Sequence, residues 1–189
     1  MKLPKPKIKG NISLEEAIAK RRSVRRFSDV PVSIEDLSQI LWAAQGIIKG
    51  RFRAVPSAGA LYPIELFVAT KEGVYRYMPD GHLLKKEIKK DTRRNLSLAA
   101  QGQSFIRKAP VNLIITAVFE RVKGRYGERG TRYVYLEAGH VAQNICLECT
   151  ALGLGTVVVG AFHDSEVQEA LKIPKDCAPI YIMPVGYRS

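Results

Sequence analysis

The sequence predicts one α+β domain. Stretches with helical spacing of apolar residues alternate irregularly with β-branched apolar stretches, without the strict strand–helix order of a doubly wound sheet. The 189 residues, of which 46% are hydrophobic, suffice for one domain with its own core. No internal repeat or interior linker divides the chain. We therefore expect a basic tail over residues 1–12 and a single domain over residues 13–189.

Two helices are expected at the start of this domain. Ser13 followed by Glu16 is a capping-box pattern, and helical spacing then carries the first helix into the basic stretch that begins at Lys20. A second cap at Ser33 opens an amphipathic helix that runs to Gly46.

The middle of the chain contains strand patterns and one short helix. In chain order we expect a loop over residues 50–59, a strand over 64–70, a hairpin over 74–84 with its turn at Asp80-Gly81, a helix over 91–101 and a buried strand over 111–119.

The last third contains a long helix and two strands. In chain order we expect a helix over residues 132–152 that ends at Gly153, a strand over 156–159, a helix capped by Asp164 that runs to Leu171 and a strand over 180–185. The arginine-rich segment 121–132 has no helical signature. We expect a solvated loop there, with a mobile lid over a substrate as the alternative.

The charge balance restricts the partners without selecting one. Thirty Lys and Arg residues against eighteen Asp and Glu give a formal charge of +12, which suits nucleic acid, an anionic membrane surface or an anionic small molecule. No nucleic-acid reader motif is present, and the longest apolar stretch is far shorter than the ~20 residues of a membrane span. Three cysteines argue against a disulfide framework and favour a cytoplasmic protein.

The densest charge lies in residues 20–26, KRRSVRR, with five cations in seven positions. One interpretation is a solvated helix C-terminus, where cations gain up to about 1 kcal/mol from the helix dipole. The other is a phosphate site, because guanidinium groups match phosphate oxygens and Ser23 adds a hydroxyl donor. A helix C-terminus repels anions, so a phosphate site there needs several arginines.

Two glycine-containing stretches are candidate ligand contacts. Residues 56–63, PSAGALYP, form either an ordinary loop or a place where small residues let the backbone approach a flat ligand. The glycines of residues 153–155 close a helix and open a strand, which excludes a dinucleotide-binding fingerprint. Gly160 marks a place where bare backbone could meet a ligand.

No catalytic or metal-binding set is recognisable. Cys146 and Cys149 fit one apolar helix face and are expected in the core, with no turn or helix N-terminus to lower a thiol pKa. Neither zinc-ligand spacing nor a Ser/His/Asp arrangement is present, so we assign no metal ligand and no catalytic side chain.

In combination, these stretches resemble the nitroreductase family of flavin enzymes, and most closely its azoline dehydrogenase branch. The resemblance runs from Ser13 to Arg188 and is carried by RRSVRRF at 21–27, PSAG and LYP within 56–63, EAGHVAQN at 137–144 and PVGYR at 184–188. It implies a central mixed β-sheet flanked by helices and a homodimer with FMN in each of two interface clefts.

The resemblance also implies roles for individual residues. Arg21, Arg22 and Ser23 would bind the FMN phosphate. Arg25 would face the pyrimidine edge of the ring, where a cation stabilises the charge of the reduced flavin. The full implied set of cofactor-binding residues is Arg21, Arg22, Ser23, Arg25, Gln45, Pro56, Ser57, Ala58, Gly59, Val159, Gly160, Ala161 and Arg188. Ser57, Ala58 and Gly59 would come from the partner chain, and Val159 to Ala161 would lie near N5.

The implied reaction is a ping-pong transfer of hydride from NADH or NADPH, through the flavin, to an oxidised small molecule such as a nitroaromatic or a quinone. The flavin would carry the chemistry, which agrees with the lack of a catalytic side chain. Three alternatives stay open: a flavin-binding protein without turnover, an azoline-type dehydrogenase, and a nucleic-acid-binding module. Many members add a C-terminal arm that wraps the partner, and the sequence ending at Ser189 leaves that feature open.

Overall fold

A six-stranded sheet forms the centre of the computed structural model, which describes residues 1–189. Its strands are β3 (Ile64–Thr70), β4 (Gly73–Met78), β5 (Leu83–Ile88), β6 (Val111–Ala117), β7 (Leu154–Thr156) and β8 (Ala178–Tyr187). They lie in the order β5-β4-β3-β6-β8-β7. A separate two-stranded hairpin consists of β1 (Ile47–Lys49) and β2 (Phe52–Arg53).

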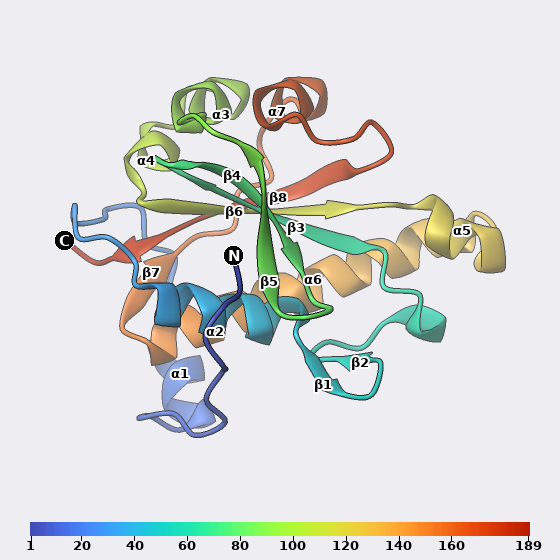
Figure 1. The fold of residues 1–189 in the computed structure, drawn as a ribbon, viewed down its shortest axis with the longest axis horizontal. Coiled ribbons are helices and arrows are strands. Elements are labelled where there is room, and N and C mark those ends of the chain that lie inside the picture. Colours follow the sequence, from blue (N-terminus) through green and yellow to red (C-terminus); the bar gives the residue numbers. More distant parts are fainter.

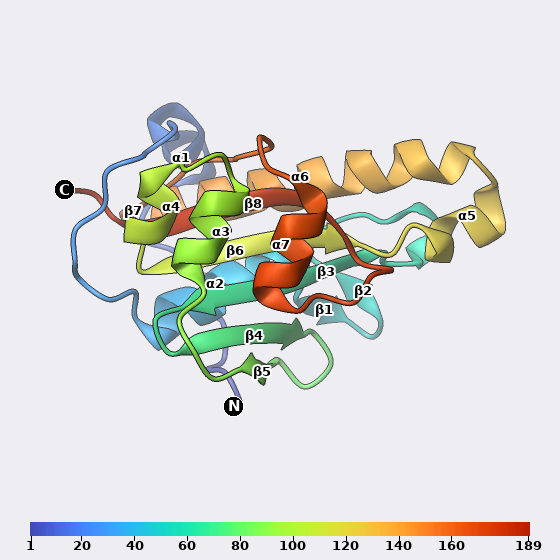
Figure 2. The ribbon, with the colours of Figure 1, turned by 90° about the horizontal axis from the view of Figure 1, so that it is seen from above.

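Helices cover both faces of the sheet (Figures 1 and 2). One face carries α1 (Leu14–Lys20), α2 (Ile34–Gln45) and the long α6 (Arg129–Ala151). The other face carries α3 (Arg93–Ala99), α4 (Ser104–Lys108) and α7 (Asp164–Leu171). The last helices are α5 (Glu120–Tyr126), which precedes α6, and the 3-10 turn η1 (Ala58–Ala60). No helix combines the length and the hydropathy that a membrane span requires.

Alternation along the strands produces a core on each face. In β3, Leu66 and Val68 belong to the core under α2 and α6, whereas Phe67 and Ala69 belong to the core under α3, α4 and α7. This follows from the two-residue period of a strand. Because both faces are covered, β3 and β6 are buried along nearly their whole length.

The predicted α+β class is confirmed, and neighbouring strands in the sheet pair antiparallel throughout. The parallel component of the expected mixed sheet is confined to one isolated bridge, between Ser23 and Thr156 at the β7 edge. This edge is therefore where the chain segment after α1 joins the sheet.

The predicted helix starts are confirmed, but the first helix is shorter than expected. Ser13 and Glu16 form both bonds of the capping box, each 3.1 Å long, and the Ser33 hydroxyl accepts from the Asp36 amide at 3.0 Å. Helix α1 ends at Lys20, and Arg21 is extended with φ −60° and ψ 126°. The arginine cluster therefore lies in extended chain beyond the helix, where the α1 carbonyls do not oppose an anion as strongly.

The prediction of a loop over residues 121–132 is wrong. Helix α5 occupies the first half of this segment, and α6 begins at Arg129 after a left-handed Gly127 with φ 56°. Only Val122 of α5 is fully buried, at 1% exposure. One buried residue in so short a helix gives no periodicity to recognise.

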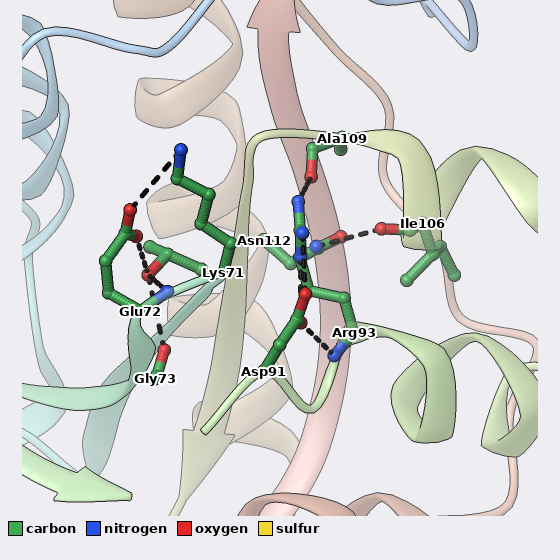
Figure 3. Close-up of polar contacts among 9 residues, drawn as sticks. Lys71, Glu72, Gly73, Asp91, Arg93, Ile106, Ala109 and Asn112 are labelled. Carbon is green, nitrogen blue, oxygen red and sulfur yellow. Dashed lines mark hydrogen bonds and ion pairs between the residues drawn. The ribbon is translucent and has the colours of Figure 1, made fainter. Parts of the chain in front are cut away.

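Three further elements differ from expectation. The hairpin of β1 and β2 overlaps the expected loop at residues 50–59, and α7 starts after His163 without a side-chain cap from Asp164. Helix α4 has only five residues, too few for a sequence pattern. It is held by the Asn112 amide, which donates to the Ile106 carbonyl at 3.0 Å (Figure 3).

The basic N-terminal segment, expected as a tail, is attached to the domain at its beginning. Leu3 is 5% exposed, and its amide donates to the His82 carbonyl at 3.0 Å. The Ser38 hydroxyl donates to the Pro4 carbonyl at 2.6 Å and lies 2.7 Å from His82 Nε2, while His82 Nδ1 lies 2.8 Å from the Tyr77 hydroxyl. Because the Ser38 hydroxyl donates its proton to the Pro4 carbonyl, Nε2 of His82 is left to donate to Ser38. In the neutral imidazole, Nδ1 then accepts from the Tyr77 hydroxyl.

We expect the attachment of the N-terminal segment through Ser38 and His82 to weaken in acid. Burial lowers the pKa of His82 below its ordinary value of 6.5, so the unfolded chain binds this proton more readily than the folded one. The contribution to stability is therefore present above pH 6.5 and is lost as the pH falls toward the folded pKa. Urea unfolding should show a larger acid loss for the parent than for His82→Asn, while the exposed His163→Asn should behave like the parent. Equal acid losses in all three proteins would contradict this assignment.

Candidate functional site

The arginine cluster is held in extended form along the edge of the sheet. Ser23 bridges to Thr156 of β7, and the Val24 amide donates to the Thr156 carbonyl at 2.9 Å. Four residues later, Phe27 bridges to Arg188, which directly follows β8. Residues 21–27 thus form an irregular outer strand at this edge.

Gly155 makes this close approach possible. A Cβ atom at this position would lie 2.6 Å from Cγ1 and 2.7 Å from Cβ of Val24, distances that real Cβ atoms do not adopt. Any larger residue must therefore push residues 21–27 away from β7. This glycine serves packing between two segments, not a dinucleotide.

Unpartnered polar atoms lie at the same edge. Thr156 Oγ1 and Arg188 Nε are buried and have no hydrogen-bond partner within the chain. Leaving a buried donor unsatisfied costs about 1–3 kcal/mol. Arg21, Arg22 and Ser23 belong to the extended segment that bridges to Thr156, so the edge carries further donor residues and an excess of positive charge. This donor set fits the phosphate of FMN.

The sequence did not identify Thr156, which reads only as part of a β-branched strand. Its function as a candidate phosphate ligand depends on its pairing with Ser23, and no local pattern predicts that pairing.

A second group of predicted residues follows β7. Val159 is buried and exchanges two backbone hydrogen bonds with Ile182, of 2.9 and 3.0 Å, whereas Gly160 and Ala161 are exposed. A Cβ on Gly160 would meet only the Tyr181 ring, at 3.8 Å. The Gly160 backbone is therefore accessible to a ligand.

Helix α4 connects this group with Arg25. The Arg25 guanidinium lies 6.0 Å from the centre of the Phe105 ring, and Gln103 Nε2 donates to the Ala161 carbonyl at 3.1 Å. Gln103 and Phe105 are thus neighbours of the candidate site that sequence reasoning missed, because it did not predict α4.

The remaining predicted residues lie elsewhere. Pro56, Ser57, Ala58 and Gly59 surround η1 near α5, on the side of the molecule opposite β7 and residues 21–27 (Figure 1). A Cβ on Gly59 would lie 2.9 Å from both Arg125 Nη1 and the Tyr126 hydroxyl. One chain therefore carries two halves of the predicted site on different sides.

Gln45 belongs to the half of the predicted site near η1. It does not belong to the sheet edge formed by residues 21–27, Thr156 and Arg188, called the arginine edge below. Its side chain is 1% exposed, and its Oε1 accepts from Arg53 Nη1 at 2.8 Å. Next to it, Glu137 of α6 is 3% exposed, and burial raises the pKa of its carboxyl group. The Gln45 amide is thus part of a buried polar cluster and is not free to reach an exposed ligand of its own chain.

The cysteines are core residues, as predicted. Cys146 and Cys149 belong to the core under α6, and burial raises both thiol pKa values, that of Cys149 well above 9.0. No group of three or more His, Cys, Asp or Glu side chains is placed to hold a metal ion.

Two cavities, of about 700 and 460 Å³, lie away from all the predicted residues. The larger lies between the N-terminal segment and helices α1, α2 and α6. The smaller lies near Lys71, Glu72 and Arg93, where Arg93 is bound to Asp91 at 2.7 Å and to the Ala109 carbonyl at 3.0 Å (Figure 3). Residues 21–27 and the η1 loop line neither of these two cavities.

Comparison with known proteins places this arrangement in a family. Residues 18–187 match the family model described as "Nitroreductase family". A Methanocaldococcus jannaschii protein named "putative nitroreductase" is 48% identical over 182 residues, which are 93% of this chain and 91% of that protein. The crystal structure of a "putative nitroreductase" from Ralstonia eutropha superimposes with a TM-score of 0.89 at 30% identity, over 99% of this chain and 88% of that one.

Two more distant relatives have more specific names. The microcin B17-processing protein McbC of Escherichia coli is 28% identical over 71% of this chain, and the FMN reductase [NAD(P)H] of Bacillus subtilis is 26% identical over 91% of it. The matches span only 54% and 64% of those longer proteins.

Proposed function

Because this chain belongs to the nitroreductase family, we propose that it is an FMN-dependent oxidoreductase that takes hydride from NADH or NADPH and delivers it to an oxidised small molecule. The observation that carries this proposal is the sheet edge at Thr156 and Arg188, where buried donors without partners lie beside a row of arginines. The name of the B. subtilis relative supports both the flavin and the nicotinamide.

The arginine edge would hold the phosphate. Arg21, Arg22 and Arg188 supply charge, while Ser23 and Thr156 supply hydroxyl donors from two paired segments. Two charges on the phosphate compensate the mutual repulsion of the cations, which otherwise costs stability. The site would thereby bind the cofactor through its phosphate and leave the isoalloxazine ring free to lie along the edge.

Arg25 and residues 159–161 would contact the ring. Arg25 lies further along the same extended segment, and its guanidinium can stabilise negative charge at the pyrimidine edge. The exposed backbone of Gly160 and Ala161 lets a flat ring approach closely. Bound FMN would supply the hydride chemistry, accepting from the nicotinamide and donating to the acceptor in alternation.

A homodimer would complete the site. Within one chain, the η1 loop is remote from the arginine edge, so Ser57, Ala58 and Gly59 can act at a flavin only in a partner subunit (Figure 1). Helix α6 has a suitable face: Tyr135 and Leu136 are 55% and 52% exposed, and Gly139 has no atom within 4 Å of its missing Cβ. Nothing within this chain requires a glycine there, which favours a second helix packing closely at that position.

A second candidate function is azoline-type dehydrogenation, with the flavin taking hydride from a ring of a modified peptide. The similarity to McbC and the PSAG-LYP form of residues 56–63 favour it. Both candidates use the same flavin site and differ in the direction of hydride transfer at the second substrate.

Anaerobic reduction tests the proposal. We expect the FMN-loaded protein to lose its yellow colour on addition of NADH or NADPH and to regain it with a quinone or a nitroaromatic compound. Protein that binds FMN but is bleached by neither nicotinamide would support a flavin-binding protein without this reductase activity. Anaerobic bleaching of the flavin by an oxazoline or thiazoline compound, without reduction by nicotinamide, would favour the dehydrogenase.

A further inference from the structure

Half of the positive charge of the chain lies in two segments beside the η1 loop, residues 56–62. Residues 47–62, which include the β1–β2 hairpin, contain three Lys or Arg and no Asp or Glu. Residues 119–133, which include α5 and the start of α6, contain five Lys or Arg and two Asp or Glu. The net charges of +3 and +3 are together half of the formal charge of +12. The arginine edge does not account for this second concentration of charge.

Both basic segments contact the loop directly. The Arg53 amide of β2 donates to the Tyr62 hydroxyl at 3.3 Å, and its guanidinium lies 4.5 Å from the centre of the Tyr62 ring. From the other side, Arg121 Nη1 of α5 donates to the Tyr62 carbonyl at 3.0 Å. Arg125, also of α5, lies against Gly59, because a Cβ there would be 2.9 Å from Arg125 Nη1. The loop is thus held between the hairpin and α5.

Three arginines at this corner have no anionic partner. They are exposed, form no ion pair and donate no side-chain hydrogen bond: Arg125, Arg129 and Arg132. The two acidic residues of the segment, Glu120 and Glu128, are both paired with Lys123, at 3.8 and 2.8 Å. The chain therefore leaves these three positive charges uncompensated.

Helix stability does not explain the arginines either. Arg129 and Arg132 lie within the first four residues of α6, where the helix dipole is positive and acidic side chains are favoured, yet this turn contains no acid. The start of α6 packs directly on α5, since a Cβ on Gly130 would lie 2.9 Å from the Lys123 amide nitrogen. Like charges gathered at one corner repel one another, and a bound anion would relieve this repulsion.

We propose that Arg125, Arg129 and Arg132 bind the 2′-phosphate of NADPH and so select NADPH over NADH as the hydride donor. This rests on the proposed function, in which the η1 loop meets the flavin of a partner subunit. A nicotinamide on that flavin lies beside the loop, and the adenosine end of the dinucleotide extends over the neighbouring surface. Guanidinium groups match phosphate oxygens, whereas NADH has only a hydroxyl group at this position.

The aromatic rings at the same corner suit the adenine of such a ligand. The Arg125 guanidinium lies 5.5 Å from the centre of the Tyr126 ring, and this ring meets the Tyr133 ring edge-on at 5.2 Å. Both rings are partly exposed. Arginine and tyrosine side chains together can therefore contact a phosphate and a base of one nucleotide.

Binding of two nucleotides to the flavin-free protein tests the site without turnover. Adenosine 2′,5′-bisphosphate represents the adenosine end of NADPH, and adenosine 5′-monophosphate represents that of NADH. By titration calorimetry, we expect the parent protein to bind the bisphosphate at least tenfold more tightly. In the double variant Arg125→Gln, Arg129→Gln, this preference should fall to about threefold or less, because one guanidinium remains.

Steady-state kinetics of the FMN-loaded protein provide the second readout. In the same double variant, kcat/KM for NADPH should fall about tenfold through a higher KM, because the 2′-phosphate is remote from the reacting atoms. The kinetics with NADH and the affinity for FMN should stay at parent values. The matched control is Lys90→Gln combined with Arg94→Gln, which removes two positive charges at the start of α3, across the sheet from α6 (Figure 1). The control should behave like the parent in both experiments.

The outcomes separate this proposal from the proposed function. Equal affinity of the parent for the two nucleotides, or an unchanged preference in the double variant, would overturn the phosphate site. Equal losses with NADPH and NADH would also overturn it, because the arginines would then act on the loop and not on the 2′-phosphate. A parent protein that prefers the bisphosphate but binds no FMN would overturn the proposed function alone, and the phosphate site would stand.

Discussion

The double substitution Arg21→Ala, Ser23→Ala is expected to weaken FMN binding by about a hundredfold or more. Hydrogen bonds to a charged group contribute about 1.5–3 kcal/mol and neutral ones about 1 kcal/mol, and each 1.4 kcal/mol is tenfold in affinity. Both side chains lie outside the buried core, so the melting temperature of the flavin-free protein should change little. Fluorescence titration with FMN measures the loss.

Arg26→Ala is the matched control for this prediction. It removes one positive charge from the same extended segment but has no assigned contact with the cofactor. We expect a small loss that disappears at high salt, as for long-range attraction between exposed charges. If the double variant retains FMN as tightly as the parent, or if Arg26→Ala matches the double variant, the phosphate site lies elsewhere.

Gly155→Ala is expected to disable the site without touching a proposed ligand. The added Cβ would lie 2.6 Å from Val24 Cγ1, so residues 21–27 must move away from β7 and separate Ser23 from Thr156. Overpacking of this kind costs about 1–3 kcal/mol of stability. FMN affinity should fall at least tenfold, because the donors no longer converge. Urea unfolding and FMN titration measure the two effects.

Two further variants isolate the steric cause. Gly124→Ala adds the same methyl group to an exposed helix position with no atom within 4 Å, and should leave stability and FMN affinity unchanged or slightly higher. Val24→Gly combined with Gly155→Ala removes the side chain that the new Cβ meets, and should restore part of the binding. Normal affinity in Gly155→Ala alone would show that close contact with β7 is unnecessary.

The parts of the fold that have a periodic signal could be predicted from the sequence. The apolar, β-branched runs of β3 and β6 and the caps at Ser13 and Ser33 are local, so their elements follow from neighbouring residues. Short elements could not be predicted, because their stabilising contacts are not local. Helices α4 and α5 have five and seven residues and are stabilised by tertiary contacts, such as the bond from Asn112 to Ile106, that no local pattern encodes.

The site was predictable where charge or small residues concentrate, and not where pairing creates it. The arginine cluster and Gly160 stand out in the sequence, although the cluster's extended conformation does not. Thr156 becomes a candidate ligand only because Ser23 pairs with it. Gln45 has the right residue type for a ring contact, but it is buried and bound by Arg53 at the other half of the site.

The most direct test of the central claim is parallel titration of the purified protein with FMN and with riboflavin, which has the same ring but no phosphate. If the arginine edge holds the phosphate, FMN should bind one per chain and riboflavin at least a hundredfold more weakly. Protein that stays colourless in excess FMN, or that binds the two flavins equally well, would contradict the account.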